Sequence, residues 1–196
     1  MSIIVVGCGS GLGREIFNYL KKNKKKVFGF SSKKTKKFEY LNLNNFNSYD
    51  FRKKINKIDR VEEVYYLSNY SENIFFTKID DKKLDTFVNF NILNFMKVMK
   101  ILIKKNNQIK INIILSHICF MYNYGFSIYK AQKLFQKNML QSIKIENPNI
   151  KINYIYPGAM KTNFVKNNKY KGKSIFKQKN PKFVAIKIIK NKKKFY

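Results

Sequence analysis

Short apolar segments alternate with longer amphipathic segments along this chain of 196 residues. Segments rich in Val, Ile, Phe and Tyr predict strands, and they cover residues 2–6, 27–30, 38–43, 61–67, 109–115 and 150–156. Segments with apolar residues every three or four positions predict helices, and they cover residues 11–20, 48–58, 81–105, 127–146 and 181–190. Because strands alternate with helices, we predict an α/β fold with a doubly wound parallel sheet of six or seven strands.

The longest predicted helix, residues 81–105, has one apolar face, which consists of Leu84, Val88, Ile92, Phe95, Met99 and Leu102. Lys97 and Lys100 interrupt its most apolar part. No stretch approaches the roughly 18 uninterrupted apolar residues of a spanning helix, so we expect no membrane span.

Length and composition indicate a globular protein. The chain is 44% hydrophobic and 16% aromatic, which is enough to build a core. No linker or repeat is evident, so we predict a single domain over residues 1–196. The two cysteines and one histidine lack the spacing of metal ligands, and no secretory signal opens the chain. We therefore predict no metal site and a cytoplasmic location.

The formal net charge of +30 comes from 41 Lys and Arg residues against 11 Asp and Glu residues. Only three of the basic residues are Arg, which is the residue that makes bidentate contacts to bases. The lysines are spread along the whole chain, as on a solvated surface. We expect no specific nucleic-acid partner. A nucleic-acid-binding domain remains a weaker alternative, and it predicts steeply salt-dependent binding without a cofactor.

A glycine-rich turn follows the first strand and opens the first helix. Its residues are Gly7, Cys8, Gly9, Ser10, Gly11, Leu12 and Gly13. Such a turn lets the backbone approach a pyrophosphate, and the helix N-terminus offers free N–H groups to it. The position and number of the glycines predict a dinucleotide site.

The segment after the second strand bears on the choice of cofactor. A site for NAD carries an acidic residue there for the ribose 2′-hydroxyl, whereas this chain has Ser31, Ser32 and Lys33. Hydroxyl groups and a cation can hold a 2′-phosphate. We predict NADP as the cofactor, with NAD as the other possibility.

The Gly-x-x-x-Gly-x-Gly spacing of the turn resembles that of the short-chain dehydrogenase/reductase family. Three further motifs follow in the family's order. They are Ser116 at the end of the fifth strand, Tyr129-x-x-x-Lys133 thirteen residues later, and Pro157-Gly158-x-x-x-Thr162 after the sixth strand. The resemblance implies a Rossmann fold and an NAD(P)-dependent oxidoreductase that acts on a small-molecule carbonyl or alcohol.

The resemblance also implies catalytic roles. Tyr129 and Lys133 share a helix face, and a nearby ammonium lowers the pKa of a phenol. Tyr129 would give or take the proton, Lys133 would also hold the nicotinamide ribose, and Ser116 would place the carbonyl oxygen. Asn91 would complete a water relay, with Asn89 as the other candidate.

The remaining implied residues hold the cofactor or cover the substrate. Asn42 stands where the family contacts the adenine, and Asn69 lies after the fourth strand. Pro157, Gly158 and Thr162 would lie along the nicotinamide end. Residues at about 159–180 form a short substrate segment. Family members often pair through their long helices, so a homodimer or homotetramer is possible.

Two departures from the family leave an alternative open. The family's Asn-Asn-Ala-Gly after the fourth strand is replaced by Leu-Ser-Asn-Tyr-Ser at residues 67–71. A second alignment puts Lys130 at the family's lysine position and Phe126 at its tyrosine position. Phe has no proton to give. The alternative function is therefore a catalytically inactive dinucleotide-binding protein with a regulatory or structural role.

Overall fold

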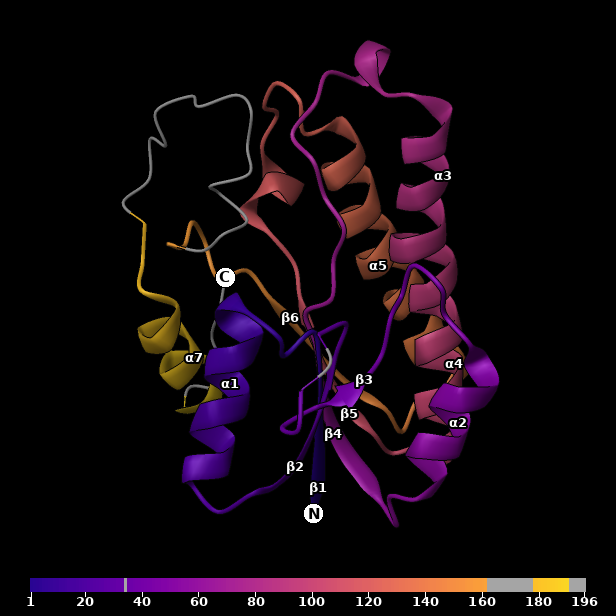
Figure 1. The fold of residues 1–196 in the computed structure, drawn as a ribbon, viewed down its shortest axis with the longest axis vertical. Helices are drawn as coiled ribbons and strands as arrows, with labels where there is room; N and C mark the ends of the chain where they lie inside the picture. The colour runs from indigo at the N-terminus through magenta and orange to yellow at the C-terminus, as the bar shows by residue number, and fades with distance from the viewer. Residues whose placement is uncertain (34, 162–177, 191–196) are drawn as a thin grey trace.

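In the computed structural model of the chain, the structure describes residues 1–33, 35–161 and 178–190. Six parallel strands form one sheet in the order β3-β2-β1-β4-β5-β6 (Figure 1). They are β1 (Ser2–Val6), β2 (Lys26–Ser31), β3 (Glu39–Tyr40), β4 (Val61–Tyr66), β5 (Lys110–Ile114) and β6 (Lys151–Ile155). The predicted doubly wound Rossmann sheet is confirmed.

Helices cover both faces of this sheet (Figure 1). The α-helices are α1 (Gly11–Lys22), α2 (Ser48–Asn56), α3 (Asp81–Val88), α4 (Asn94–Lys105), α5 (Ser127–Glu146) and α7 (Pro181–Lys190). Between them lie the 3-10 turns η1 (Phe76–Lys78) and η3 (His117–Phe120), and the π-helical turn η2 (Asn89–Leu93). The helices α1 and α7 lie against each other on one face, while α2, α4 and α5 lie on the other.

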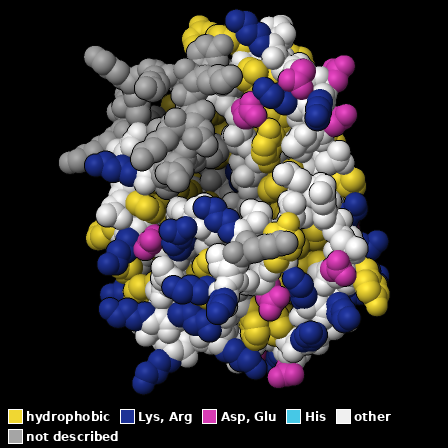
Figure 2. Space-filling model, in the orientation of Figure 1, with side chains coloured by type: hydrophobic (Ala, Val, Ile, Leu, Met, Phe, Trp, Pro, Cys, Tyr) yellow, Lys and Arg dark blue, Asp and Glu magenta, His cyan; other side chains and the backbone are white. Residues whose placement is uncertain are grey.

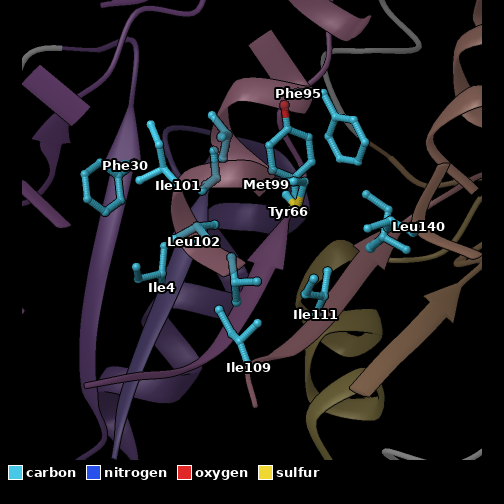
Figure 3. Packing of buried hydrophobic residues seen from close by; sticks show 14 of the residues in the cluster. Ile4, Phe30, Tyr66, Phe95, Met99, Ile101, Leu102, Ile109, Ile111 and Leu140 are labelled. Carbon is cyan, nitrogen blue, oxygen red and sulfur yellow. The ribbon is translucent and has the colours of Figure 1, made fainter. Parts of the chain in front are cut away.

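Each face of the sheet has its own apolar core. Figure 3 shows the larger core, in which Tyr66 of β4 lies beside Phe95 and Met99 of α4. The rings of Tyr66 and Phe95 are 5.1 Å apart and meet edge to face. The smaller core joins β1 to α1 and α7. Since β1 is buried on both faces, its unbroken apolar run is what a central parallel strand requires.

The structure corrects two details of the predicted elements. The third strand shrinks to Glu39–Tyr40, two exposed residues at the sheet edge. The predicted helix over residues 81–105 contains the five-residue π turn η2. A π turn shifts the phase of the helix, so Val88 is 45% exposed although Phe95, Met99 and Leu102 are buried. The single apolar face predicted for this helix is therefore wrong at Val88.

The same helix, Asp81–Lys105, is the one in the described part of the chain that is long and apolar enough to cross a membrane. Nearly half of its most apolar window is buried inside the protein. Its buried side contacts the sheet and α2, which is the position of a core helix.

A polar ladder crosses three neighbouring strands. Asn153 Nδ2 donates to Asn112 Oδ1 at 2.7 Å, and Asn112 Nδ2 donates to Glu63 Oε1 at 2.9 Å. Lys110 Nζ lies 3.4 Å from the same carboxylate oxygen. Glu63 and Asn112 are buried, so these contacts stabilise groups that would otherwise be costly inside the sheet.

Basic side chains are distributed over the surface. In Figure 2, Lys and Arg side chains spread widely over the face shown, with Asp and Glu side chains between them. This distribution agrees with the even spacing of lysines along the sequence.

Candidate active site

The glycine-rich turn joins β1 to α1 at the carboxyl end of the sheet. Gly7 has φ +91°, a left-handed conformation that favours glycine. A Cβ on Gly13 would lie 2.2 Å from the Gly7 carbonyl oxygen, so the helix can approach the strand only because Gly13 has no side chain. Arg14 closes the turn by donating from Nη2 to the Gly9 carbonyl oxygen. This turn presents the N-terminus of α1 to the neighbouring pocket.

The pocket has a volume of about 180 Å³ and lies where the strand order reverses, between β1 and β4. Ligands of open α/β sheets bind at such a switch point. Its lining comes from the ends of β1 and β2 and from the segments after β1, β2, β3 and β4, with Phe90 from the π turn η2. The residues are Val6, Gly7, Gly9, Ser10, Phe30, Ser31, Ser32, Lys33, Leu41, Leu67, Ser68, Asn69 and Phe90.

Seven of the predicted cofactor residues line this pocket: Gly7, Gly9, Ser10, Ser31, Ser32, Lys33 and Asn69. Gly11, Leu12 and Gly13 lie beside it in the first turn of α1. Asn42 lies outside the lining, one residue after Leu41, and its Oδ1 accepts from the Asn44 N–H. Among the described residues, the lining contains no Asp or Glu.

Ser31 and Lys33 form a short turn at the rim of the pocket. The Ser31 Oγ accepts a hydrogen bond from the Lys33 N–H at 3.0 Å. Ser31 is buried, whereas Ser32 and Lys33 are exposed. The exposed hydroxyl and ammonium are therefore free to face an anionic group.

Asn69 connects the pocket to α5. Gln132 Nε2 donates to Asn69 Oδ1 at 2.6 Å. The Asn69 Nδ2 and Gln132 Oε1 atoms are buried and have no hydrogen-bond partner within the described chain. Buried polar atoms rarely stay unpaired, so this part of the pocket suits a ligand with hydroxyl groups, such as a nucleotide ribose.

Ser116 and Tyr129 meet beyond the carboxyl end of β5. Ser116 caps η3, and its Oγ accepts from the Ile118 N–H at 3.3 Å. A side-chain hydrogen bond joins Tyr129, in the first turn of α5, to Ser116. Two hydroxyl groups that the sequence separates by thirteen residues thus share one site.

Lys133 lies one turn further along α5 and is 3% exposed. Its Nζ donates to the Ile114 carbonyl oxygen at 2.9 Å and to Gln136 Oε1 at 3.3 Å. The Nζ lies 5.9 Å from the centre of the Tyr129 ring. Burial lowers the pKa of Lys133 from its ordinary value of 10.5 to about 8, because the charged form loses its hydration.

The pKa of Tyr129 departs from the sequence prediction. Burial raises it from 10.0 to about 12, although the hydrogen bond from Ser116 acts in the opposite direction. The prediction that the Lys133 ammonium sets this pKa below its usual value is therefore wrong. Desolvation of the phenolate outweighs the ammonium, which is directed at Ile114 and Gln136 instead.

The other possible register places its residues elsewhere. Phe126 precedes α5 as its N-cap residue. Lys130 Nζ donates to the Met121 carbonyl oxygen at 2.9 Å and lies 3.4 Å over the ring of Tyr122. In this arrangement Lys130 is held by the loop after η3, whereas Tyr129 contacts Ser116.

Asn91 lies in the π turn η2 and is 1% exposed, while Asn89 is exposed. Its Oδ1 accepts from the Tyr70 N–H at 2.9 Å, and its Nδ2 donates to the Tyr70 carbonyl oxygen at 2.8 Å. Its own carbonyl oxygen accepts from Gln136 Nε2 at 3.4 Å. Asn91 therefore fixes the loop after β4 against α5.

The segment after β6 lies beside η3. Pro157 is buried, and Gly158 has φ +76°. His117 is exposed, and its Nε2 lies 3.1 Å from the Tyr156 carbonyl oxygen. Thr162 and most of the predicted substrate segment at 159–180 lie outside the described residues.

No group of three or more His, Cys, Asp or Glu side chains within the described ranges is arranged to hold a metal ion. The polar groups near Tyr129 are hydroxyl, ammonium and carboxamide groups, which suit proton transfer and the binding of ribose and carbonyl oxygens.

The family model for short chain dehydrogenases matches residues 54–172, more than half of the chain. The chain belongs to the short-chain dehydrogenase/reductase family. The recognition made from the glycine turn and the Tyr129 and Lys133 motif is confirmed, and this family member is an oxidoreductase.

Solved short-chain dehydrogenases share the fold of this one. A short-chain dehydrogenase/reductase from Vibrio parahaemolyticus is 18% identical with a TM-score of 0.81, covering 96% of this chain and 91% of its own. One from Shigella flexneri 2a, complexed with NADP, is 15% identical with a TM-score of 0.81, covering 92% and 86%. An alcohol dehydrogenase from Thermococcus sibiricus, complexed with 5-hydroxy-NADP, is 14% identical with a TM-score of 0.77, covering 98% and 91%. No curated protein matches this short-chain dehydrogenase in sequence.

Sequence reasoning missed three residues of this short-chain dehydrogenase. Gln132 and Gln136 contact Asn69, Lys133 and Asn91, and Arg14 closes the glycine turn. A signal for the two glutamines was present, because they stand four residues apart on the side of α5 that carries the apolar Leu140 four residues later. Polar residues on an inward helix face indicate a buried network.

Proposed function

We propose that this protein is an NADP-dependent oxidoreductase that interconverts a carbonyl compound and its alcohol. The observation that carries the proposal is the contact of Ser116 with Tyr129, one helical turn from the buried Lys133. This constellation lies beyond the carboxyl end of the sheet, as does the dinucleotide pocket. The residues form one domain with a small substrate segment after Gly158.

The reaction needs a hydride and a proton. When bound, NADPH would supply the hydride for the carbonyl carbon. Tyr129 donates the proton to the carbonyl oxygen and is reprotonated from solvent. Its raised pKa, about 12, keeps the phenol protonated at neutral pH, which suits a general acid.

The neighbours of Tyr129 place the substrate and the cofactor. Ser116 donates a hydrogen bond to the carbonyl oxygen and holds it beside the Tyr129 hydroxyl. Lys133 would bind the nicotinamide ribose, and Asn91, in the π turn η2, would complete a water relay. Pro157 and Gly158 would face the nicotinamide end of the cofactor, and Thr162, which the resemblance assigns the same role, lies outside the described residues.

The glycine turn and the neighbouring pocket residues would hold the adenosine half of NADP. Gly7, Gly9, Gly11 and Gly13 admit the pyrophosphate to the α1 N-terminus. The 2′-phosphate would be held by three neighbouring residues at the end of β2: Ser31, Ser32 and Lys33. Asn69 would bind the ribose, and Asn42, which lies outside the pocket lining, would contact the adenine. The absence of Asp and Glu from the pocket lining supports NADP over NAD, as do the NADP-type nucleotides in the Shigella and Thermococcus proteins.

Titration with NADPH, followed by the nucleotide's own fluorescence, tests the cofactor. The chain has no Trp, so the protein background is low. NADPH should bind at micromolar concentrations and NADH at least tenfold more weakly. The variant Lys33→Glu should abolish this preference, because a carboxylate repels the 2′-phosphate. Lys36→Glu makes the same charge change at an exposed residue outside the lining and should keep the preference. Failure of a folded sample to bind either nucleotide would refute the proposal.

Turnover tests the chemistry. NADPH oxidation with a panel of small carbonyl compounds should be rapid for the wild type and at least a hundredfold slower for Tyr129→Phe. If the protein binds NADPH but turns over none of them, and Tyr129→Phe changes nothing, it is the alternative, a non-catalytic dinucleotide-binding protein. The cytoplasmic location and the homodimer or homotetramer stay predictions.

A further inference from the structure

Gln136 is a buried carboxamide that joins two of the proposed active-site residues. It lies on α5, three residues beyond Lys133, and is 0% exposed. Its Oε1 accepts from Lys133 Nζ at 3.3 Å, and its Nε2 donates to the Asn91 carbonyl oxygen at 3.4 Å. The family resemblance implies a water relay at Asn91, and in addition the Gln136 side chain spans from Lys133 to Asn91.

The contacts of Lys133 determine where its remaining N–H can point. An ammonium has three N–H donors. One is directed to the Ile114 carbonyl oxygen at the end of β5, and a second to Gln136. The third is left for the side of Tyr129, whose ring centre is 5.9 Å from the Nζ. A strand and a side chain thus hold the cation from two directions.

Asn91 gives Gln136 a firm anchor. The Asn91 side chain is bonded to both backbone groups of Tyr70, so its own position is fixed. The Asn91 carbonyl oxygen then orients the Gln136 amide, because only the Nε2 end can donate to it. This leaves the Oε1 end for Lys133.

We propose that Gln136 is a positioning residue, which clamps the Lys133 ammonium between Ile114 and Asn91 and directs its free N–H toward Tyr129 and the nicotinamide ribose. The inference rests on the proposed function, since that reaction is what the ammonium is positioned for. A carboxamide keeps its N–H protons at neutral pH, so Gln136 orients Lys133 and passes no proton.

The titration of Lys133 itself tests this clamp without any nucleotide. Lysine labelled with ¹³C at Cε reports each ammonium by NMR, and the variant Lys133→Arg identifies the Lys133 signal. The other titratable groups that act on Lys133 are Tyr129 and Cys119. In the wild type the Lys133 signal should move with a midpoint near 8.

Two variants should move that midpoint in opposite directions. Gln136→Met removes the acceptor at similar volume, so the midpoint should fall by about one unit. Gln136→Glu places a carboxylate beside the ammonium, so the midpoint should rise. The matched control is Gln132→Met, which removes a buried glutamine of the same helix that contacts Asn69 instead. It should leave the midpoint unchanged.

Each outcome decides the proposal. Opposite shifts in the two Gln136 variants, with none in Gln132→Met, support it. An unchanged midpoint in a folded Gln136 variant, or an equal shift in the control, overturns it. If Gln136→Met does not fold, the rise in Gln136→Glu decides alone. NADPH binding by the wild type tests the proposed function separately. If the protein binds no nucleotide but shows both shifts, the role of Gln136 is supported and the proposed oxidoreductase function is refuted.

Discussion

The buried Lys133 ammonium should make this protein less stable at neutral pH than at mildly alkaline pH. Its pKa is lowered from 10.5 in the unfolded chain to about 8 in the folded protein. Between these values the unfolded chain binds more protons, so stability rises with pH. Below pH 8 Lys133 is protonated in both the folded and the unfolded state. Burial of the charged ammonium then lowers the free energy of unfolding by about 3 kcal/mol. About 2 kcal/mol of that should be recovered between pH 7 and pH 9.5.

Replacement of Lys133 by Met isolates this contribution. Methionine has a similar length and no charge, so the variant loses the group that titrates. Urea unfolding, followed by far-UV circular dichroism, gives the free energy of unfolding at both pH values. Between pH 7 and pH 9.5 the wild type should gain about 2 kcal/mol more than Lys133→Met. Groups that titrate in both proteins cancel in this difference.

The control is Lys130→Met, one turn earlier on α5. It removes a lysine whose Nζ is held by the Met121 carbonyl oxygen in a loop. This variant should keep the wild-type pH dependence. If the free energies of unfolding of the wild type and Lys133→Met change with pH in parallel, burial does not lower the pKa of Lys133. The reasoning from desolvation is then refuted.

Three further outcomes follow from contacts in the structure. Alcohol oxidation needs Tyr129 to accept a proton, and the pKa of its phenol is raised to about 12. The rate of oxidation should therefore rise steadily from pH 7 to pH 10, as the phenolate fraction grows. A rate that does not change over this range would contradict the prediction. Gly13→Ala would place a methyl group 2.2 Å from the Gly7 carbonyl oxygen. It should lower the free energy of unfolding in urea by about 1–3 kcal/mol and the affinity for NADPH at least tenfold. Wild-type affinity for NADPH would count against the tight turn. Asn112→Leu removes the donor 2.9 Å from the buried Glu63 carboxylate and should cost about 2 kcal/mol or more by the same assay; a neutral result would mean that water replaces the amide.

Sequence patterns predicted best the helices and strands in which the spacing of apolar residues is regular from end to end. The helix Ser127–Glu146 and the strand Ser2–Val6 begin and end where the sequence indicated. The third strand contracted to Glu39–Tyr40, because an edge position with little burial gives a weak pattern. The π turn at Asn89–Leu93 was missed since it inserts a phase shift that ordinary helical spacing does not encode.

The candidate site was predictable where a motif fixed the spacing. Ser116, Tyr129 and Lys133 could be grouped from the sequence, but the direction of the pKa of Tyr129 could not. That direction depends on how deeply the fold buries the phenol, which no spacing reveals. Gln136 escaped notice for a similar reason, because its importance lies in reaching Asn91 from a distant segment.

The central place of β1 has a consequence for how the chain folds. Its neighbours are Lys26–Ser31 and Val61–Tyr66, so its five buried residues stay uncovered until the crossover through α2 brings β4 alongside. Parallel pairing over such separations is slow, and uncovered apolar strands associate readily. A net charge of +30 makes partly folded chains repel one another during that interval. Refolding at low ionic strength should therefore give more monomer than refolding in high salt, where screening lets the exposed strands meet.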